Sequence, residues 1–484
     1  MHSLVSIGQE LCLRGHNVTV ASFGKDGESK TRKYSNGCAL RYVSLGPNPL
    51  SKKDLAEAIS NKLATTNNTF LQAKNAAKYI FSRVYGKLDG PVEKLLSQGV
   101  VSPNFAILTL PLGGLPSIMN RYGIDFAINL PTSLMPPAAD QVAAWVPPPF
   151  VSETVEQLSY LSRSAVVVFN VVLHLGRHFG SLLGFIPDQA GELNIRHIRG
   201  KLWLINSIPG LDYPQPLPPL VQYTGPMINT DAMDGVERMP PEVDSFLGSV
   251  PPDKPVVYVS YGTVAVLSED LVRHISAQFT GEDFYVVWAL PKSQQNGLPK
   301  QLPRNVFVHH WIPTPRILAN PKVRVFVSHC GGNSVSESIA LGVPIVGYPQ
   351  FGDQLPNCAR LASSGAGIAA KPQSWLRKDH VLKVLQDPTY EQRAKALGRL
   401  FKLYGGVNRA ADLIEADVRG DLEMLITPPD VSFSSWFFLN GYDLLVFLAV
   451  LCSLLPWFVS SFIRHCLAAL WTAKRSRAAK AHSA

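Results

Sequence analysis

Residues 325–354 read VFVSHCGGNSVSESIALGVPIVGYPQFGDQ, and this stretch gives the clearest fold signal in the chain. Its apolar start predicts a buried strand, its two glycines a tight turn, and the residues that follow a helix. The first N–H groups of a helix are unpaired and lie at the positive end of its dipole, so the turn is a ready site for an anion. Gly331 and Gly332 let the backbone approach a phosphate, and Asn333 and Ser334 are candidates for the N-cap.

Polar side chains flank this turn on both sides. His329 precedes it and adds a donor, and Glu337 lies one turn into the helix, where a carboxylate can accept hydrogen bonds from hydroxyl groups. A second loop ends in Asp353 and Gln354, a pair suited to sugar hydroxyls. Taken singly, each of these side chains also fits a core position, a solvated helix face or a helix cap. Together they indicate a nucleotide-sugar site.

The run closely resembles the donor-binding signature of the UDP-glycosyltransferases, which are inverting enzymes of the GT-B fold. The resemblance implies a stacking residue for uracil at Trp311, and a residue beside the base at Thr314, where many members have Gln. It implies diphosphate contacts at His329, Gly331, Asn333 and Ser334. It implies a ribose contact at Glu337 and contacts with the sugar hydroxyls at Asp353 and Gln354. The apolar run 255–263 ends in Gly262 and Thr263, and the family has the same strand and turn facing the donor phosphates.

Length and composition restrict the class of protein. The 484 residues suffice for two large domains, and 46% hydrophobic residues are typical of a globular chain with a membrane contribution. The net charge of +9 is moderate, and the body of the chain has no basic run interleaved with aromatics, so we expect no nucleic-acid partner. The six cysteines form no CxxC or Cys/His metal pattern, and we expect buried free thiols.

Strand-like and helix-like runs alternate along most of the chain, which predicts an α/β fold of two doubly wound, Rossmann-like domains facing a cleft. We expect residues 1–235 to form an N-terminal acceptor-binding domain and residues 236–426 a C-terminal UDP-sugar-binding domain. The proline-dense segment 213–226 reads as the linker between them. The Pro-rich segment 131–150 reads as a loop over the acceptor cleft. The apolar segment 165–185 reads as a core helix pair, or alternatively as a pocket wall or membrane contact.

The individual elements follow from local pattern. Helices are expected at 3–13, 54–63 and 71–87. Strands are expected at 17–22, 105–110, 126–130, 202–205, 255–263, 285–290, 306–309, 324–328 and 345–348. The chain thus opens with a helix and a strand that suit the second and third elements of a doubly wound domain. We expect the sequence to begin inside the fold, without its first strand or a signal peptide.

An uncharged apolar segment, residues 444–463, is long enough to cross a bilayer as a helix. Residues 427–443 form a membrane-proximal segment, and residues 464–484 form a basic tail. The positive-inside rule places this tail in the cytoplasm and the body in the lumen. A buried core helix is the alternative. Family members of animal type share this single-pass plan in the endoplasmic reticulum, which the resemblance therefore implies here.

Inverting transfer needs a base for the acceptor hydroxyl and stabilisation of the leaving diphosphate. The chain has no Asp-x-Asp pair, so we expect no metal or other cofactor, and the helix start at Asn333 supplies the charge stabilisation. In the family a His follows the first strand and an Asp farther along the chain orients it. His2 is the local candidate for the base, and Thr109 stands at the Asp position, with Asp125 nearby. The catalytic residues therefore stay unassigned.

These observations favour a membrane-anchored glycosyltransferase. We expect it to move a hexose, glucose or glucuronic acid, from a UDP-sugar to a hydroxyl of a small hydrophobic acceptor such as a sterol, lipid or phenol. Because the His/Asp dyad is not visible, a catalytically inactive homologue that binds UDP-sugar or acts as a scaffold is the alternative.

Overall fold

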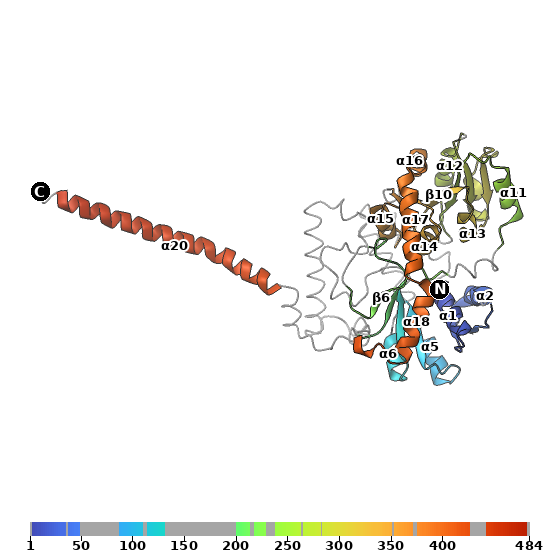
Figure 1. Ribbon diagram of the computed structural model, residues 1–484, viewed down its shortest axis with the longest axis horizontal. Coiled ribbons are helices and arrows are strands. Elements are labelled where there is room, and N and C mark those ends of the chain that lie inside the picture. The colour runs from blue at the N-terminus through green and yellow to red at the C-terminus, as the bar shows by residue number, and fades with distance from the viewer. Residues whose placement is uncertain are drawn as a thin grey trace. The chain divides into compact units, whose positions relative to one another are not determined.

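The protein was analysed as a computed structural model, which describes residues 2–34, 37–48, 87–109, 114–130, 200–212, 217–228, 238–262, 265–281, 283–350, 353–370, 375–425 and 442–481. The chain divides into two compact units, Met1–Ile426 and Thr427–Ala484. Figure 1 shows the helices and strands of both units with the labels used below. The expected helix 54–63, the loop 131–150 and the apolar segment 165–185 lie outside the described residues, as does nearly all of 71–87.

The second half of the larger unit is built on a parallel sheet with the strand order β12-β11-β10-β7-β8-β9. The strands are β7 Val256–Ser260, β8 Tyr285–Ala289, β9 Val306–His309, β10 Val323–Ser328, β11 Ile345–Gly347 and β12 Gly367–Ala369. The chain runs outward from β7 through β8 to β9, then crosses to β10 and continues the other way. The sheet therefore changes winding direction between β7 and β10, and ligands of such sheets bind beyond the strand ends at this point.

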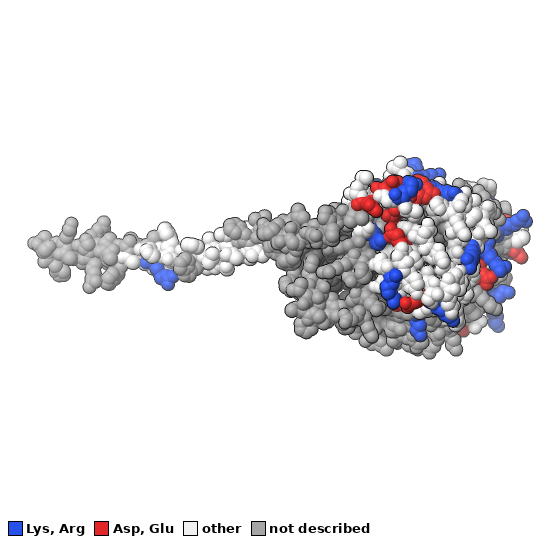
Figure 2. Space-filling model, turned by 90° about the horizontal axis from the view of Figure 1, so that it is seen from below, with Lys and Arg blue, Asp and Glu red and all other residues white. Residues whose placement is uncertain are grey.

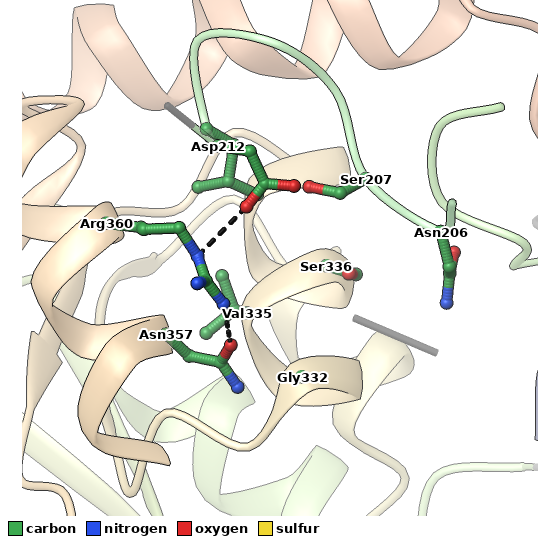
Figure 3. A pocket seen from close by; sticks show the side chains of 9 residues that line it. Asn206, Ser207, Asp212, Gly332, Val335, Ser336, Asn357 and Arg360 are labelled. Carbon is green, nitrogen blue, oxygen red and sulfur yellow. Dashed lines mark hydrogen bonds and ion pairs between the residues drawn. The ribbon is translucent and has the colours of Figure 1, made fainter. Parts of the chain in front are cut away.

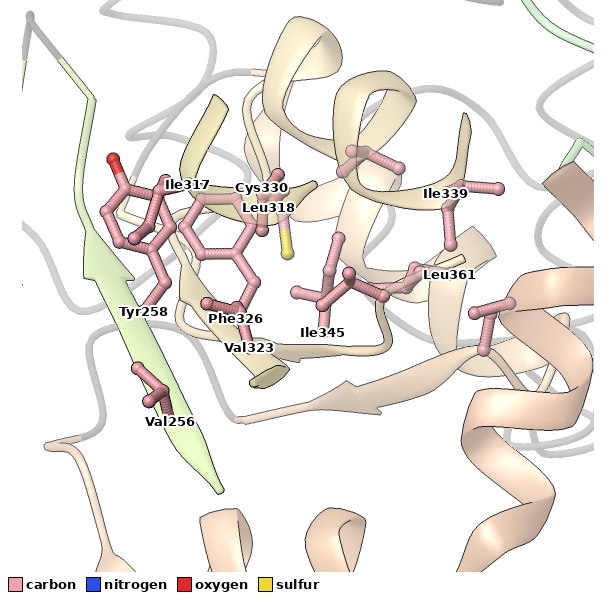
Figure 4. Packing of buried hydrophobic residues seen from close by; sticks show 14 of the residues in the cluster. Val256, Tyr258, Ile317, Leu318, Val323, Phe326, Cys330, Ile339, Ile345 and Leu361 are labelled. Atoms are coloured by element: carbon pink, nitrogen blue, oxygen red, sulfur yellow. The ribbon is translucent and has the colours of Figure 1, made fainter. Parts of the chain in front are cut away.

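Both faces of this sheet are covered. Successive residues of β7 alternate between two apolar clusters: Val256 and Tyr258 pack on one side, and Val257 and Val259 on the other. Figure 4 shows the first cluster, in which the ring of Tyr258 stacks on that of Phe326. Such unbroken apolar strands are expected where helices cover both faces of a parallel sheet. The helical elements of this half are α11 Pro241–Ser249, α12 Glu269–Ala277, η2 Lys292–Gly297, α13 Thr314–Leu318, α14 Gly332–Ala340, α15 Gln354–Ser363, α16 Lys378–Gln386 and α17 Pro388–Leu403.

The first half contains two parallel sheets, and no strand among its described residues joins them. One sheet pairs β1 Thr19–Ser22 with β2 Arg41–Ser44. The other has the order β3-β4-β5-β6 and consists of β3 Phe105–Thr109, β4 Asp125–Leu130, β5 Trp203–Ile205 and β6 Val221–Tyr223. The helices among its described residues are α1 His2–Leu13, α2 Gly24–Tyr34, α5 Asp89–Ser97 and α6 Leu115–Arg121. The prediction that residues 213–226 form a linker is therefore partly wrong, since β6 lies within this range and forms the edge strand of a sheet.

The chain returns to the first half near its C-terminal end. Helix α18, Gly406–Val418, contributes Val407 and Ile414 to an apolar cluster that also holds Ile7 of α1 and Leu204 of β5. A short helical turn, η3 Glu423–Leu425, follows it. The last helix of the larger unit thus ties the two halves together.

Two cysteine pairs correct the expectation of free thiols. Cys12 and Cys38 form a disulfide, and so do Cys330 and Cys358, with Cα atoms 6.0 and 5.4 Å apart respectively. The second bond joins the turn after β10 to α15, two segments that sequence spacing alone does not bring together. Among the described side chains Cys452 is a free cysteine.

The smaller unit contains the helix α20, Tyr442–Ala481, with Pro456 inside it. Its window Leu448–His465 is long and apolar enough to cross a membrane. Large apolar side chains point outward along it, with Leu455 63% exposed and Phe462 72% exposed. Figure 2 shows that the described surface of this helix is nearly free of charge. The expected apolar segment 444–463 thus lies within a single helix.

Candidate functional site

The candidate site lies at the carboxyl ends of β7 and β10, where the sheet changes winding direction. The turns after these strands carry Gly262 and His329, which are in contact. A Cβ atom built on Gly262 would lie 2.6 Å from Cε1 of the His329 ring, and one on Gly331 would lie 2.5 Å from Nε2. Gly262 also has a φ of +74°, which glycine adopts without strain. The imidazole therefore occupies the space that the two glycines leave open.

The His329 ring is buried and makes a hydrogen bond with the backbone of Ser260. Its Nδ1 atom has no hydrogen-bond partner among the residues that the structure describes. Burial lowers the pKa of His329 to about 4, because charging the ring in this environment is costly. At neutral pH the ring is uncharged and carries one N–H, which it can donate either to the Ser260 backbone or to an anionic ligand, but not to both.

Helix α14 begins directly after this histidine. Cys330 has a φ of 61°, and the N-cap is Gly331, which makes no side-chain capping bond. The expectation that Asn333 or Ser334 caps the helix is wrong, because the left-handed Cys330 closes the turn early and places both residues inside the first turn. Their backbone N–H groups belong to the unpaired set at the helix start, which favours negative charge.

Two aromatic residues, Trp311 and Tyr258, lie on the side of the site near α13. Trp311 follows β9 and is 43% exposed, so its indole offers an apolar surface. Thr314 is the first residue of α13, and its Oγ1 lies 3.2 Å from Oη of the buried Tyr258. Burial raises the pKa of Tyr258 to about 12, with a contribution from the charge of Glu337. Thr314 therefore contacts this phenol, and Glu337 is near enough to act on it electrostatically.

Glu337 lies in the second turn of α14, and burial raises its pKa to about 8. Its carboxyl group is thus held near the point of ionisation in the physiological range. A carboxylate here can accept two hydrogen bonds from neighbouring hydroxyl groups, such as those of a ribose.

The loop before α15 brings a second carboxyl group to the start of α14. Asp353 accepts hydrogen bonds from the N–H of Gly332 and from Nδ2 of Asn357, the latter at 3.0 Å. Burial raises the pKa of Asp353, and these hydrogen bonds oppose the rise. Gln354 is only 4% exposed, and its Oε1 accepts the N–H of Gln350 at 2.9 Å, so it holds the loop in this structure.

The structure thus brings most of the expected donor-binding residues to one end of one sheet. Thr263 lies outside the described residues. The arrangement offers an exposed aromatic face, a neutral imidazole, a helix start and two carboxyl groups that are partly shielded from solvent.

The structure gives less information on the residues considered for the catalytic base and its orienting partner. Thr109 ends β3, and its hydroxyl donates to the carbonyl oxygen of Asn129 at 3.1 Å. Asp125 lies at the opposite end of β4 and forms an ion pair with Lys201, so it is remote from Thr109. His2 begins α1, and its side chain is outside what the structure describes.

Sequence reasoning missed one polar residue at these strand ends. Asn129 is fully buried, and its Nδ2 donates to Oγ of Ser3 in α1 at 3.0 Å. Its only signal in the sequence is an amide within the apolar strand DFAINL. Asn129 therefore links α1 to the end of β4, next to Thr109.

Comparison with known proteins agrees with this geometry. Residues 138–404, more than half of the chain, match the family described as UDP-glucoronosyl and UDP-glucosyl transferase. The chain belongs to this family. It is 27% identical over 457 residues to 2-hydroxyacylsphingosine 1-beta-galactosyltransferase from Homo sapiens, covering 87% of this chain and 81% of that protein. It is 31% identical over 206 residues to UDP-glucuronosyltransferase 3A1 from Mus musculus, covering 41% of this chain and 38% of that protein.

Two solved glycosyltransferase structures share the fold. The glycotransferase of kitacinnamycin aligns with a TM-score of 0.54 at 22% identity, covering 86% of this chain and 94% of that one. CalG4, the calicheamicin glycosyltransferase, aligns with a TM-score of 0.56 at 18% identity, covering 87% and 95%. The expected GT-B fold is confirmed, and the chain is a transferase of the UDP-glycosyltransferase family.

Proposed function

We propose that this UDP-glycosyltransferase moves a hexose from a UDP-sugar to a hydroxyl group of a small hydrophobic acceptor, with inversion at the anomeric carbon. The observation that carries the proposal is the convergence of Trp311, His329, Glu337 and the start of α14 at one set of strand ends. Each group suits a different part of one ligand: the indole a base, the carboxyl a ribose, and the imidazole with the helix start a diphosphate.

In this proposal Trp311 stacks on uracil, with Thr314 at the edge of the base. Glu337, once ionised, accepts the ribose hydroxyls. The diphosphate lies against the start of α14 and takes the His329 N–H in place of the Ser260 backbone. Gly262 and Gly331 leave room for it, and Thr263, Asn333 and Ser334 add donors. The carboxyl of Asp353 and the side chain of Gln354 take hexose hydroxyls.

The leaving diphosphate gains negative charge as the glycosidic bond breaks. We propose that the helix dipole and the His329 N–H stabilise this charge, so that transfer needs no metal ion or other cofactor. A base close to the acceptor removes its hydroxyl proton, and the described residues do not identify this base.

The acceptor class rests on two observations. The outward apolar side chains of α20 suit a lipid environment, and the human relative is named for transfer to an acylsphingosine. We propose a lipid, sterol or phenol acceptor and glucose or glucuronic acid as the sugar. We also propose that α20 anchors the protein once in the endoplasmic reticulum membrane, with the body in the lumen and the basic tail in the cytoplasm.

One observation favours a second function, UDP-sugar binding without transfer. The position at the end of β3 carries Thr109, whose hydroxyl is used on the Asn129 carbonyl and cannot act as an anion. A transfer assay separates the two functions. The full chain is incubated with labelled UDP-glucose, UDP-glucuronic acid or UDP-galactose and a panel of sterols, ceramides and phenols. A glycoside of inverted configuration supports transfer, whereas UDP-sugar binding without any product supports the second function.

A further inference from the structure

The Asp353 carboxyl is held by a side chain that reaches two parts of the site. Nδ2 of Asn357 donates to Oδ2 of Asp353 at 3.0 Å and to the carbonyl oxygen of Cys330 at 3.1 Å. Asn357 is 6% exposed, so these bonds are shielded from competing water. The amide therefore fixes the Asp353 carboxyl relative to the turn that precedes α14.

Arg360, one turn later in α15, determines which way this amide faces. Its Nη2 atom donates to Oδ1 of Asn357 at 2.6 Å. Guanidinium groups only donate hydrogen bonds, so the amide oxygen has to face Arg360 and the amide nitrogen has to face Asp353. A bond between a charged donor and an amide oxygen is stronger than one between neutral groups.

The other side of the guanidinium contacts the first half of the chain. Its Nε atom lies 2.9 Å from Oδ1 of Asp212, and the two side chains are 10% and 4% exposed. Asp212 belongs to an ordered turn after β5, in which its N–H donates to the Ile208 carbonyl and its carbonyl accepts from Gly210. Figure 3 shows Arg360 between Asp212 and Asn357, in the wall of a cavity that also includes Gly332 and Ser336 of α14.

Four side chains thus form a continuous path from the first half to the sugar end of the site. The ion pair between Arg360 and Asp212 alone would be enough to join the two halves. The additional hydrogen bond from Arg360 to Asn357 connects this ion pair to the donor site. By contrast, the ion pairs of Arg14, just after α1, with Asp412 and Glu415 of α18 have no connection to the donor loops.

We propose that Arg360 is a positioning residue for the donor sugar: paired with Asp212, it orients Asn357 and thereby holds the Asp353 carboxyl where it meets the hexose. Contact between the two halves then sets the affinity for the sugar part of the donor. This inference rests on the proposed function, in which Asp353 contacts the hexose of a UDP-sugar.

The test compares two ligands that differ only in the hexose. UDP and UDP-glucose are titrated by calorimetry into the full chain in detergent, for the wild type and for Arg360→Met and Asp212→Asn. We expect each variant to bind UDP-glucose about 10-fold more weakly than the wild type, the size expected for losing a hydrogen bond to a charged group. Affinity for UDP should change less than about 2-fold on the same scale.

Arg14→Met is the matched control, because it removes an arginine that joins the turn after α1 to α18. It should lower the thermal midpoint and leave the ratio of UDP to UDP-glucose affinities unchanged. Asp212→Asn keeps the size of the side chain. If Arg360→Met does not fold, the ratio of UDP to UDP-glucose affinities in Asp212→Asn alone tests the proposal.

An unchanged affinity ratio in Asp212→Asn and Arg360→Met, with UDP bound normally, would overturn the positioning role and leave the proposed function intact. An equal loss for both ligands would also overturn it, since that result indicates a general structural role. Failure of the wild type to bind UDP would overturn the proposed function and this inference together.

Discussion

Replacement of Glu337 by Gln should change stability and donor binding in opposite directions. The glutamine keeps the size of the side chain and resembles the protonated acid, so it removes the cost of ionising a buried carboxyl group. In the unfolded chain Glu337 ionises near pH 4.5, and in the folded protein burial raises its pKa to about 8. Between these values the unfolded state releases a proton that the folded state retains, so the wild type loses stability as pH rises.

The size of the stability difference follows from the interval between the two pKa values of Glu337. Each pH unit between the two pKa values is worth about 1.4 kcal/mol, which gives an upper limit of about 5 kcal/mol above pH 8. Glu337 keeps partial contact with solvent, and we therefore expect about 2 kcal/mol. Near pH 4.5 and below, the wild type and Glu337→Gln should be about equally stable. At pH 8.5 the variant should unfold a few degrees higher.

Donor affinity should move the other way. Glu337→Gln replaces an anionic acceptor at the ribose with a neutral amide, and UDP affinity at pH 8.5 should fall by about 10-fold or more. The assay pairs thermal unfolding at pH 5 and pH 8.5 with calorimetric titration of UDP. A variant that is less stable than the wild type at pH 8.5, or that binds UDP equally well, would refute the reasoning.

Three further predictions follow from the site and the anchor. Gly262→Ala should destabilise the protein by about 2–4 kcal/mol and weaken UDP binding, because the methyl group meets the His329 ring at a left-handed φ. Gly248→Ala, in helix α11 with open space around it, should not lower the thermal midpoint and should leave UDP affinity unchanged. Cys358→Ser should lower the free energy of unfolding by about 3–4 kcal/mol, because it opens the disulfide to Cys330, and calorimetry should show weaker UDP binding. A variant with the affinity and thermal midpoint of the wild type would contradict the link between the phosphate turn and α15. A chain ending at residue 441 should stay in solution without detergent and bind UDP like the full chain, whereas dependence on detergent would show that α20 is not the anchor.

Local pattern was sufficient for the framework of the second half. The strand expected at 306–309 matches β9, and the strand expected at 324–328 begins one residue earlier as β10. Both runs are rich in valine and phenylalanine, and β10 is buried along most of its length, so their own composition identifies them. The turn between strand and helix was also predictable, because paired glycines follow the strand.

Features that depend on backbone dihedrals or on distant partners were not predictable. The cap of α14 was misplaced because side-chain chemistry favours Asn333, while the left-handed Cys330 determines where the helix starts. Strand β6 was hidden in a proline-dense segment, since a short edge strand tolerates prolines around it. The Cys330–Cys358 bond and the Asp212–Arg360 pair join segments far apart in the chain, and periodicity contains no information on such pairs.

The measurement that tests the central claim most directly is a calorimetric titration of UDP into the full chain and into His329→Ala at pH 8.5. The account predicts saturable binding at one site in the wild type and a loss of affinity of about 10-fold or more in the variant. No saturable binding to the wild type, or equal affinity in His329→Ala, would contradict a donor site at the ends of β7 and β10.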